Sequence, residues 1–179
     1  MKKGFEILDN KNSRDSLFKY RESGALRGCY LGFPLLDEYY TLALPGCTDI
    51  TGFPASGKTE FWLEVLLNAS LFYGMKHLLY VPDIGDKNEI LAILIHKVTG
   101  KTFDKRFVNS NYISEQEVDR NLDWVLHHFR ILTKVDLKAK ITPYEFYDLA
   151  AKINAETEGG IQTATIDSWK DMKHGIGLD

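Results

Sequence analysis

Residues 52–59 read G-F-P-A-S-G-K-T and follow the spacing G-x-x-x-x-G-K-[ST]. The two glycines permit backbone angles and a close approach that a Cβ atom would block. A loop of this kind turns its backbone N–H groups inward, and the helix that follows points its positive end at the same place. This is the chemistry of phosphate binding. The expected phosphate-binding residues are Gly52, Phe53, Pro54, Ala55, Ser56, Gly57, Lys58, Thr59 and Glu60.

Lys58 and Thr59 carry the functional groups of this loop. We expect the Lys58 ammonium to act catalytically, because it can reach the outer phosphates of a nucleotide and neutralise their charge. The Thr59 hydroxyl can hold a magnesium ion. A Gly-rich turn that matches by chance is the alternative, but an expected strand before the loop and an amphipathic helix after it favour a nucleotide site.

A second metal-binding residue is expected far along the chain. Asp167 ends the short run A-T-I-D, which has the composition of a strand. In open α/β sheets, a carboxylate at the C-terminal end of a central strand lies near the phosphate loop. We therefore expect Asp167 to hold magnesium together with Thr59, directly or through water.

Hydrolysis of a nucleotide would need a third carboxylate to polarise the attacking water. Asp83 is the first candidate, because it follows Pro82 at the end of an expected strand. Asp86 and Glu89 compete for this role. Ordinary turn chemistry, or a cap on the next helix, would also account for these acidic residues.

The elements that must position these residues alternate between strands and helices. We expect strands at residues 47–51, 77–81, 129–132 and 162–166. Helices are expected over residues 60–72 and 88–98, and after capping boxes that begin at Ser114 and Thr142. Helices between successive strands predict crossover connections, a parallel sheet and an α/β fold.

The first 29 residues are polar and mix both signs of charge, so we expect an N-terminal arm or linker with a short helix at most. The main domain is expected over residues 30–179. Lys plus Arg number 22 against 25 Asp plus Glu, which argues against tight non-specific nucleic-acid binding through bulk charge. The sequence contains neither a bilayer-length apolar run nor a secretory signal pattern, and its two cysteines are expected to be free thiols. A cytoplasmic protein without membrane association is expected.

These residues resemble the RecA-like ATPase core of DnaB-like and Twinkle-like replicative helicases. Residues 31–37, L-G-F-P-L-L-D, are similar to the family's lead-in, and residues 44–51 run into the phosphate loop as family members do. Residues 78–84 resemble the family's second strand, and Asp83 falls on the catalytic Glu that ends it. The stretch from Thr142 through Gly159 to Asp167 is similar to the one that leads to the family's magnesium-binding Asp. Asp in place of Glu, and Pro82 before it, depart from the family pattern.

The resemblance implies a three-layer P-loop NTPase fold of the RecA-like type with a mostly parallel central sheet. It implies ATP and Mg²⁺ as cofactors, and ATP hydrolysis coupled to translocation on single-stranded DNA during DNA replication. A homo-hexamer with nucleotide at the subunit interfaces is expected. The C-terminal part of such a core, with its DNA-binding loops and arginine finger, is expected to lie outside these 179 residues.

Three other functions fit the same loop. A RecA-like recombinase or remodelling ATPase would share every motif named above. A P-loop small-molecule kinase fits the length, but the sequence lacks an Arg-rich lid segment. A nucleotide-binding interaction module without turnover is favoured by the shortened carboxylate at Asp83.

Overall fold

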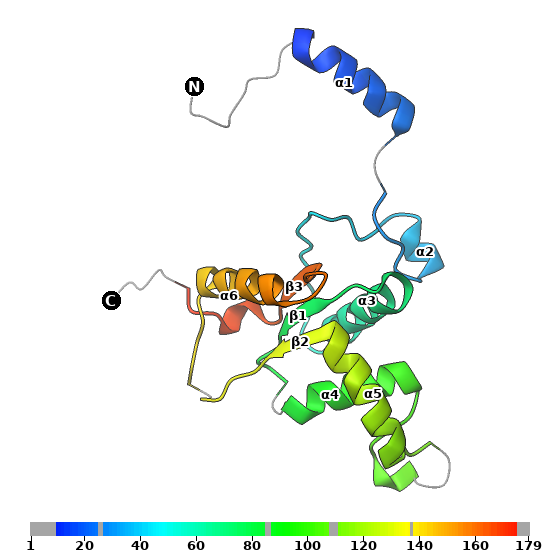
Figure 1. Cartoon of the computed structure of the whole chain (residues 1–179), viewed down its shortest axis with the longest axis vertical. Coiled ribbons are helices and arrows are strands. Elements are labelled where there is room, and N and C mark those ends of the chain that lie inside the picture. Colours follow the sequence, from blue (N-terminus) through cyan, green and yellow to red (C-terminus); the bar gives the residue numbers. More distant parts are fainter. Residues whose placement is uncertain (1–9, 25–26, 85–86, 108–110, 137, 175–179) are drawn as a thin grey trace. The chain divides into compact units, whose positions relative to one another are not determined.

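A computed structural model gives the arrangement of the chain (Figure 1). It describes residues 10–24, 27–84, 87–107, 111–136 and 138–174. Contacts between Cα atoms divide the chain into two compact units, Met1–Thr48 and Asp49–Asp179. The phosphate-loop sequence, Asp83 and Asp167 all belong to the second unit.

The described residues of the first unit form two helices and one backbone bridge. The short helix expected in the N-terminal segment is α1, Asn10–Ser23, and α2 spans Pro34–Asp37. Cys29 and Leu42 form an antiparallel bridge, with N–H···O distances of 2.9 Å in both directions. This bridge closes the segment that leads toward the phosphate loop.

The second unit alternates helices and strands from the phosphate loop onward. Four helices are longer than one turn: α3 (Lys58–Tyr73), α4 (Lys87–Thr99), α5 (Glu115–His128) and α6 (Pro143–Glu156). Three strands lie among them: β1 (His77–Tyr80), β2 (Phe129–Leu132) and β3 (Thr163–Ile166). Two 3₁₀ turns, η1 (Lys105–Phe107) and η2 (Trp169–Asp171), complete the described elements.

The strands form a parallel sheet in the order β2-β1-β3. His77 pairs with both Phe129 and Thr163, and Tyr80 pairs with both Leu132 and Ile166. All four residues of β1 are buried, because this strand has a neighbour on each side and helices above and below. A parallel three-stranded sheet among helices is compatible with the expected α/β class.

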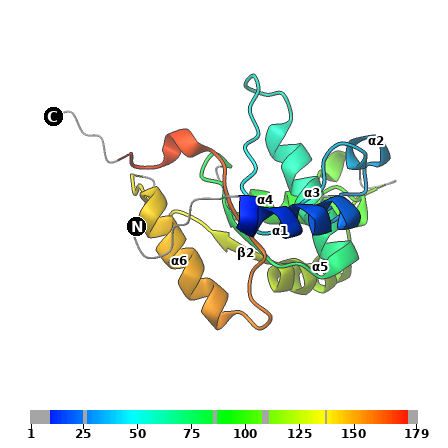
Figure 2. The same ribbon diagram turned by 90° about the horizontal axis from the view of Figure 1, so that it is seen from above.

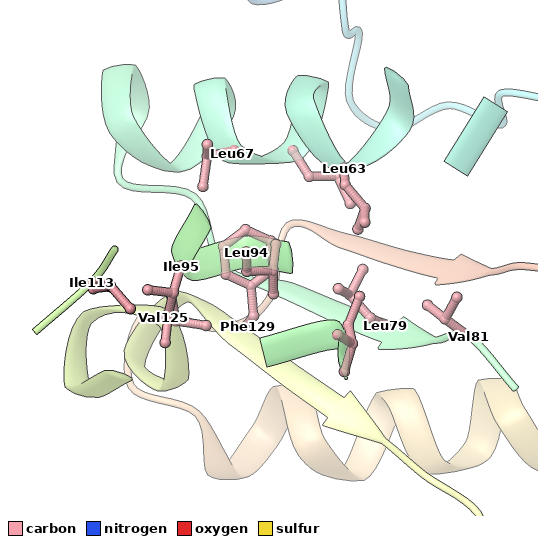
Figure 3. Packing of buried hydrophobic residues seen from close by; sticks show 11 residues of the cluster. Leu63, Leu67, Leu79, Val81, Leu94, Ile95, Ile113, Val125 and Phe129 are labelled. Carbon is pink, nitrogen blue, oxygen red and sulfur yellow. The ribbon is translucent and has the colours of Figure 1, made fainter. Parts of the chain in front are cut away.

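Helices cover both faces of this sheet. Seen from above, α6 lies on one side of the strands and α3, α4 and α5 lie on the other (Figure 2). Alternation along β1 explains this, because successive side chains of a strand point to opposite faces. Leu79 packs among residues of α3, α4 and α5 (Figure 3), whereas Leu78 and Tyr80 pack against Phe146 of α6.

The strand expected at residues 47–51 is not formed. These residues are exposed and have no strand assignment, and they pair with no strand in the described part of the chain. β-branched side chains favour an extended backbone, but a strand exists only where a neighbour supplies the other half of each hydrogen bond. Both edges of β1 are taken by β2 and β3.

The helix starts follow the sequence closely. Ser114 caps α5 and Thr142 caps α6, and each accepts a hydrogen bond from the backbone N–H of the Glu three residues later. Both Glu side chains bond back to the cap residue, so the two expected capping boxes are confirmed. Among the described residues, no helix has the length and apolar character needed to cross a membrane.

Candidate functional site: a phosphate loop between helix α3 and strand β3

The phosphate-loop residues lead directly into α3. Gly57 is the N-cap of this helix, with a φ of 82° that a side chain would disfavour. Ala55 also has a positive φ, 57°, so the backbone turns sharply twice just before the helix. A Cβ atom at Gly52 would lie 3.2 Å from Ser56 Oγ, so a side chain there would require Ser56 to shift slightly.

The loop is open to solvent and close to the positive end of a long helix. Residues 52–57 are all exposed, and 87% of the Phe53 surface is accessible. The first N–H groups of any helix have no partner within it, and α3 has 16 residues whose dipoles add at its N-terminus. An anion can therefore approach the start of α3 from solvent.

The Lys58 ammonium lies over its own loop. Its Nζ atom donates to Gly52 O at 3.1 Å and to Phe53 O at 2.8 Å. These carbonyl contacts hold the charged end of the side chain beside the segment that would surround a phosphate. The expected position of Lys58 at the phosphate site is consistent with this geometry.

Thr59 and Asp167 meet across the fold. Thr59 Oγ1 donates to Asp167 Oδ2 at 2.5 Å, although 108 positions separate the two residues. Asp167 directly follows β3, and its backbone N–H donates to Tyr80 O, which fixes the carboxylate at the end of the sheet. Trp62 Nε1 also donates to Thr165 Oγ1 at 2.9 Å and so ties α3 to β3.

A hydroxyl and a carboxylate oxygen at one point are a suitable pair for magnesium. Mg²⁺ prefers oxygen ligands, and it is commonly held by one or two protein groups together with phosphates and water. In the described residues, no three His, Cys, Asp or Glu side chains gather into a metal-binding group. The donor set of Thr59 and Asp167 therefore fits a magnesium ion that arrives with a phosphate, rather than a metal held by protein alone.

Glu60 is turned away from the loop. Its carboxylate forms an ion pair with Lys97 of α4 at 2.9 Å, and Glu64 binds the same ammonium at 3.1 Å. Burial acts to lower the pKa of Lys97, but the hydrogen bonds that Lys97 donates to the two carboxylates outweigh it and raise this pKa. In the structure Glu60 joins α3 to α4.

Asp83 lies three residues beyond the end of β1. Its Oδ2 atom is 3.2 Å from Lys170 Nζ, and 48% of its side chain is exposed. Glu89 lies in the first turn of α4 and is exposed, and Asp86 lies outside the described residues.

The turn after β3 supplies residues that the sequence patterns did not single out. Ser168 Oγ donates to Asp171 Oδ2 at 2.7 Å. The hydrogen bond from Ser168 contributes most to a lowered pKa of Asp171, and the nearby Asp83 carboxyl group and the charges of Lys170 and Lys134 contribute as well. The polar run S-W-K-D, which follows the expected strand and Asp167, is the sequence pattern that could have indicated these residues.

The lead-in motif has a structural explanation. Asp37 is buried, and its carboxylate accepts hydrogen bonds from Leu31 N at 2.6 Å and Gly32 N at 3.1 Å. Gly32 has a φ of 82°, which allows the sharp turn that brings both N–H groups to one carboxylate. The final Asp of L-G-F-P-L-L-D therefore closes a loop within the first unit.

Two hollows of the second unit lie away from the loop. One, of about 330 Å³, is lined by residues of β1, β2 and α6 and by Thr157. The other, of about 650 Å³, lies near Tyr73, His127 and Gln162. Neither is lined by residues 52–59.

The candidate site thus consists of residues 52–59, with Asp167 bound to Thr59 and Asp83 after the neighbouring strand β1. Compared with known protein families, with curated proteins and with solved structures, the sequence gives no significant match.

Proposed function

We propose that this chain binds Mg²⁺–ATP on residues 52–59 and is the ATP-binding part of a DnaB-like replicative DNA helicase. The observation that carries the proposal is the 2.5 Å contact between Thr59 Oγ1 and Asp167 Oδ2. A Gly-rich turn of no function would not require a carboxylate from the end of a distant strand beside the first turn of its helix. The turn angles at Ala55 and Gly57 support the same conclusion.

Each residue then has a defined task. The backbone N–H groups of the loop and the start of α3 bind the phosphates, and the Lys58 ammonium neutralises their charge. Magnesium, when bound, supplies further charge neutralisation, and Thr59 and Asp167 would hold it. Asp83 accepts a hydrogen bond from the attacking water and orients it.

The helicase assignment is the finer part of this proposal. It rests on the order of three features: a phosphate loop, a carboxylate after the next strand, and a late Asp after the neighbouring strand. In such a motor, ATP lies between subunits of a hexamer, and single-stranded DNA is bound largely by segments outside these residues. A RecA-like recombinase or remodelling ATPase uses the same three features and differs in what it does to DNA.

Nucleotide binding without turnover is a second candidate, and one contact favours it. Asp83 lies 3.2 Å from the Lys170 ammonium, so its carboxylate is engaged in an ion pair rather than directed at a water molecule. Under this second candidate function, bound ATP would stabilise one conformation of the chain. The rate of ATP hydrolysis would equal that of buffer without protein.

Nucleotide affinity tests the binding step. We expect Lys58→Ala to weaken ATP binding by more than about tenfold, or about 1.4 kcal/mol. Lys152→Ala, at an exposed position on α6, is the matched control. Equal affinity in the Lys58 variant and the wild type would exclude the phosphate-loop assignment.

Magnesium dependence tests the second half of the site. Wild-type affinity for ATP should rise when EDTA is replaced by magnesium, and Asp167→Asn should lose most of this gain because it removes an anionic ligand. Asp148→Asn, exposed on α6, should keep it. A full magnesium response in Asp167→Asn would remove this residue from the site.

Turnover on DNA separates the candidates. The helicase proposal expects ATP hydrolysis that increases with single-stranded DNA, and unwinding of a forked duplex. Stimulated hydrolysis without unwinding would favour a recombinase or remodelling ATPase. Binding without hydrolysis above the buffer level would favour the second candidate.

A further inference from the structure

Lys170 is paired with the carboxylate that would face the reacting water. Its Nζ atom lies 3.2 Å from Asp83 Oδ2, and 73% of the Lys170 side chain is exposed. The two residues come from the segments that follow β1 and β3, which are neighbours in the sheet. The contact therefore joins two strand ends at the edge of the sheet where Asp167 meets Thr59.

The charge of Lys170 also acts on a second carboxylate. Asp171 accepts a hydrogen bond from Ser168, which contributes most to its lowered pKa, and the nearby Asp83 carboxyl group and the Lys170 charge contribute as well. Asp171 therefore favours its ionised form beside Asp83, and the Lys170 charge acts on both residues. Lys134, which follows β2, is a further positive charge on this group.

The same edge must accept a strongly anionic ligand if the proposed function holds. Asp83, Asp167 and Asp171 already place three carboxylates after the neighbouring strands β1 and β3. The Lys58 ammonium lies on the loop side of the site, where it contacts the carbonyls of Gly52 and Phe53. The outermost phosphate of a triphosphate would lie farther from the loop than the inner ones, so it needs a cation on the side of the strand ends.

Lys170 can supply this cation with little loss of folding stability. Exposed ion pairs contribute little to stability, so the bond to Asp83 is easily exchanged. A lysine side chain is a mobile point charge on a flexible stem, which suits it to change partners. A phosphate oxygen carries more charge than a shared carboxylate and would be the stronger partner.

We propose that Lys170 is a second phosphate-binding residue, which leaves Asp83 for the outermost phosphate when a nucleoside triphosphate binds. Asp83 is thereby released to accept a hydrogen bond from water only when a triphosphate is bound. This inference rests on the proposed nucleotide site and adds a residue that distinguishes triphosphate from diphosphate. The exchange breaks no covalent bond.

Affinities for two nucleotides test the inference without depending on turnover. The ligands are the non-hydrolysable triphosphate adenosine 5′-(β,γ-imido)triphosphate and ADP, both with magnesium, measured on the full chain by equilibrium binding. We expect Lys170→Met to weaken triphosphate binding by about tenfold and ADP binding by less than about twofold. Lys170→Arg should retain most of the discrimination, because it keeps the charge.

Lys173→Met is the matched control. Lys173 is exposed, belongs to the same segment and carries the same charge, but its charge acts on Glu145. Lys173→Met should leave the affinities for the triphosphate analogue and for ADP unchanged. Equal weakening of triphosphate and diphosphate binding by Lys170→Met would overturn the proposal, as would no change in either.

The exchange itself is tested by Asp83→Asn. Removal of the competing carboxylate should strengthen triphosphate binding in the wild-type background and should do so much less in the Lys170→Met background. Equal strengthening in both backgrounds would mean that Asp83 acts by simple charge repulsion, and it would overturn the exchange. Should the wild type bind neither nucleotide and Lys58→Ala match it, the proposed function itself fails, a result that differs from failure of Lys170 alone.

Discussion

His77 is a buried polar side chain at the start of the central strand. Its Nδ1 atom lies 2.7 Å from Thr163 Oγ1, and its Nε2 atom lies 3.0 Å from Ser70 Oγ. Because Ser70 donates its own hydrogen to Met75 O, its oxygen accepts a hydrogen from Nε2. Burial favours the neutral imidazole, so Nδ1 accepts from Thr163 and both ring nitrogens are satisfied.

Acid should destabilise the chain through this residue. Burial lowers the pKa of His77 to about 4 from its usual 6.5. Between these two pH values the unfolded chain binds more protons than the folded chain. The contribution of His77 to the free energy of unfolding is therefore fully present above pH 6.5 and is lost as the pH falls toward 4. We expect His77 to account for roughly 2 kcal/mol of the loss in unfolding free energy between pH 7.5 and pH 5.

Urea unfolding at the two pH values measures this contribution. His77→Gln should be less stable than the wild type at pH 7.5, but it should lose less stability on acidification. His174→Gln, at an exposed position, should show the full wild-type loss. A loss in His77→Gln as large as that in the wild type would assign the acid sensitivity to other groups.

Among the elements, the helix starts depend on contacts that span only a few residues. Thr142 Oγ1 and the Glu145 carboxylate lie 2.8 Å apart, and Pro143 occupies the first turn of α6. Hydrogen bonds from the Thr142 backbone and side chain lower the pKa of Glu145. The start of α6 is therefore held by its own cap residue.

Loss of this cap should be measurable. We expect Thr142→Ala to reduce the free energy of unfolding by about 1 kcal/mol, because N–H groups at the start of α6 lose their acceptor. Urea unfolding at neutral pH measures the change. Thr133→Ala, at an exposed position outside the helices, should differ from the wild type by less than about 0.5 kcal/mol.

The difference between short-range and long-range contacts explains which elements could be predicted from the sequence. Both capping boxes, β2 and the helices after the loop depend on short-range patterns, and they form where the patterns indicate. The strand expected at residues 47–51 is absent because its formation depends on a neighbour, and local composition does not specify one.

The candidate site divides in the same way. The turn angles of the phosphate loop arise from residues that are adjacent in the sequence, so a spacing pattern is enough to find them. The Thr59–Asp167 contact could be anticipated only by assuming a parallel sheet. The pairing of Asp83 with Lys170 could not be anticipated, because it depends on how the turn after β3 folds back toward β1.

For the molecule as a whole, the sheet is assembled from distant parts of the chain. β1 pairs with β2 and β3, and His77 and Thr163 are 86 positions apart. By contrast, α3 and α4 are consecutive helices that pack together with β1 on one face. Loop closure over long separations is slow, so contacts between nearby helices should form before the sheet is complete.

Pulse-labelling hydrogen exchange during refolding tests this order. We expect amides of α3 and α4 to become protected before those of β3. Leu94→Ala should slow folding, because its side chain packs in the early cluster, whereas Ile166→Ala should mainly accelerate unfolding. Simultaneous protection of the helices and β3 would contradict this order.

The central position of β1 also has a consequence during protein synthesis. Both of its partners are encoded downstream, so β1 leaves the ribosome well before either strand can pair with it. During that interval α3 and α4 can shield Leu79, but Leu78 and Tyr80 must wait for α6 to be translated. Nearly half of the second unit is therefore synthesised between β1 and α6, and the face of Leu78 and Tyr80 stays exposed during that time. We expect a chaperone to bind the nascent chain at this stage.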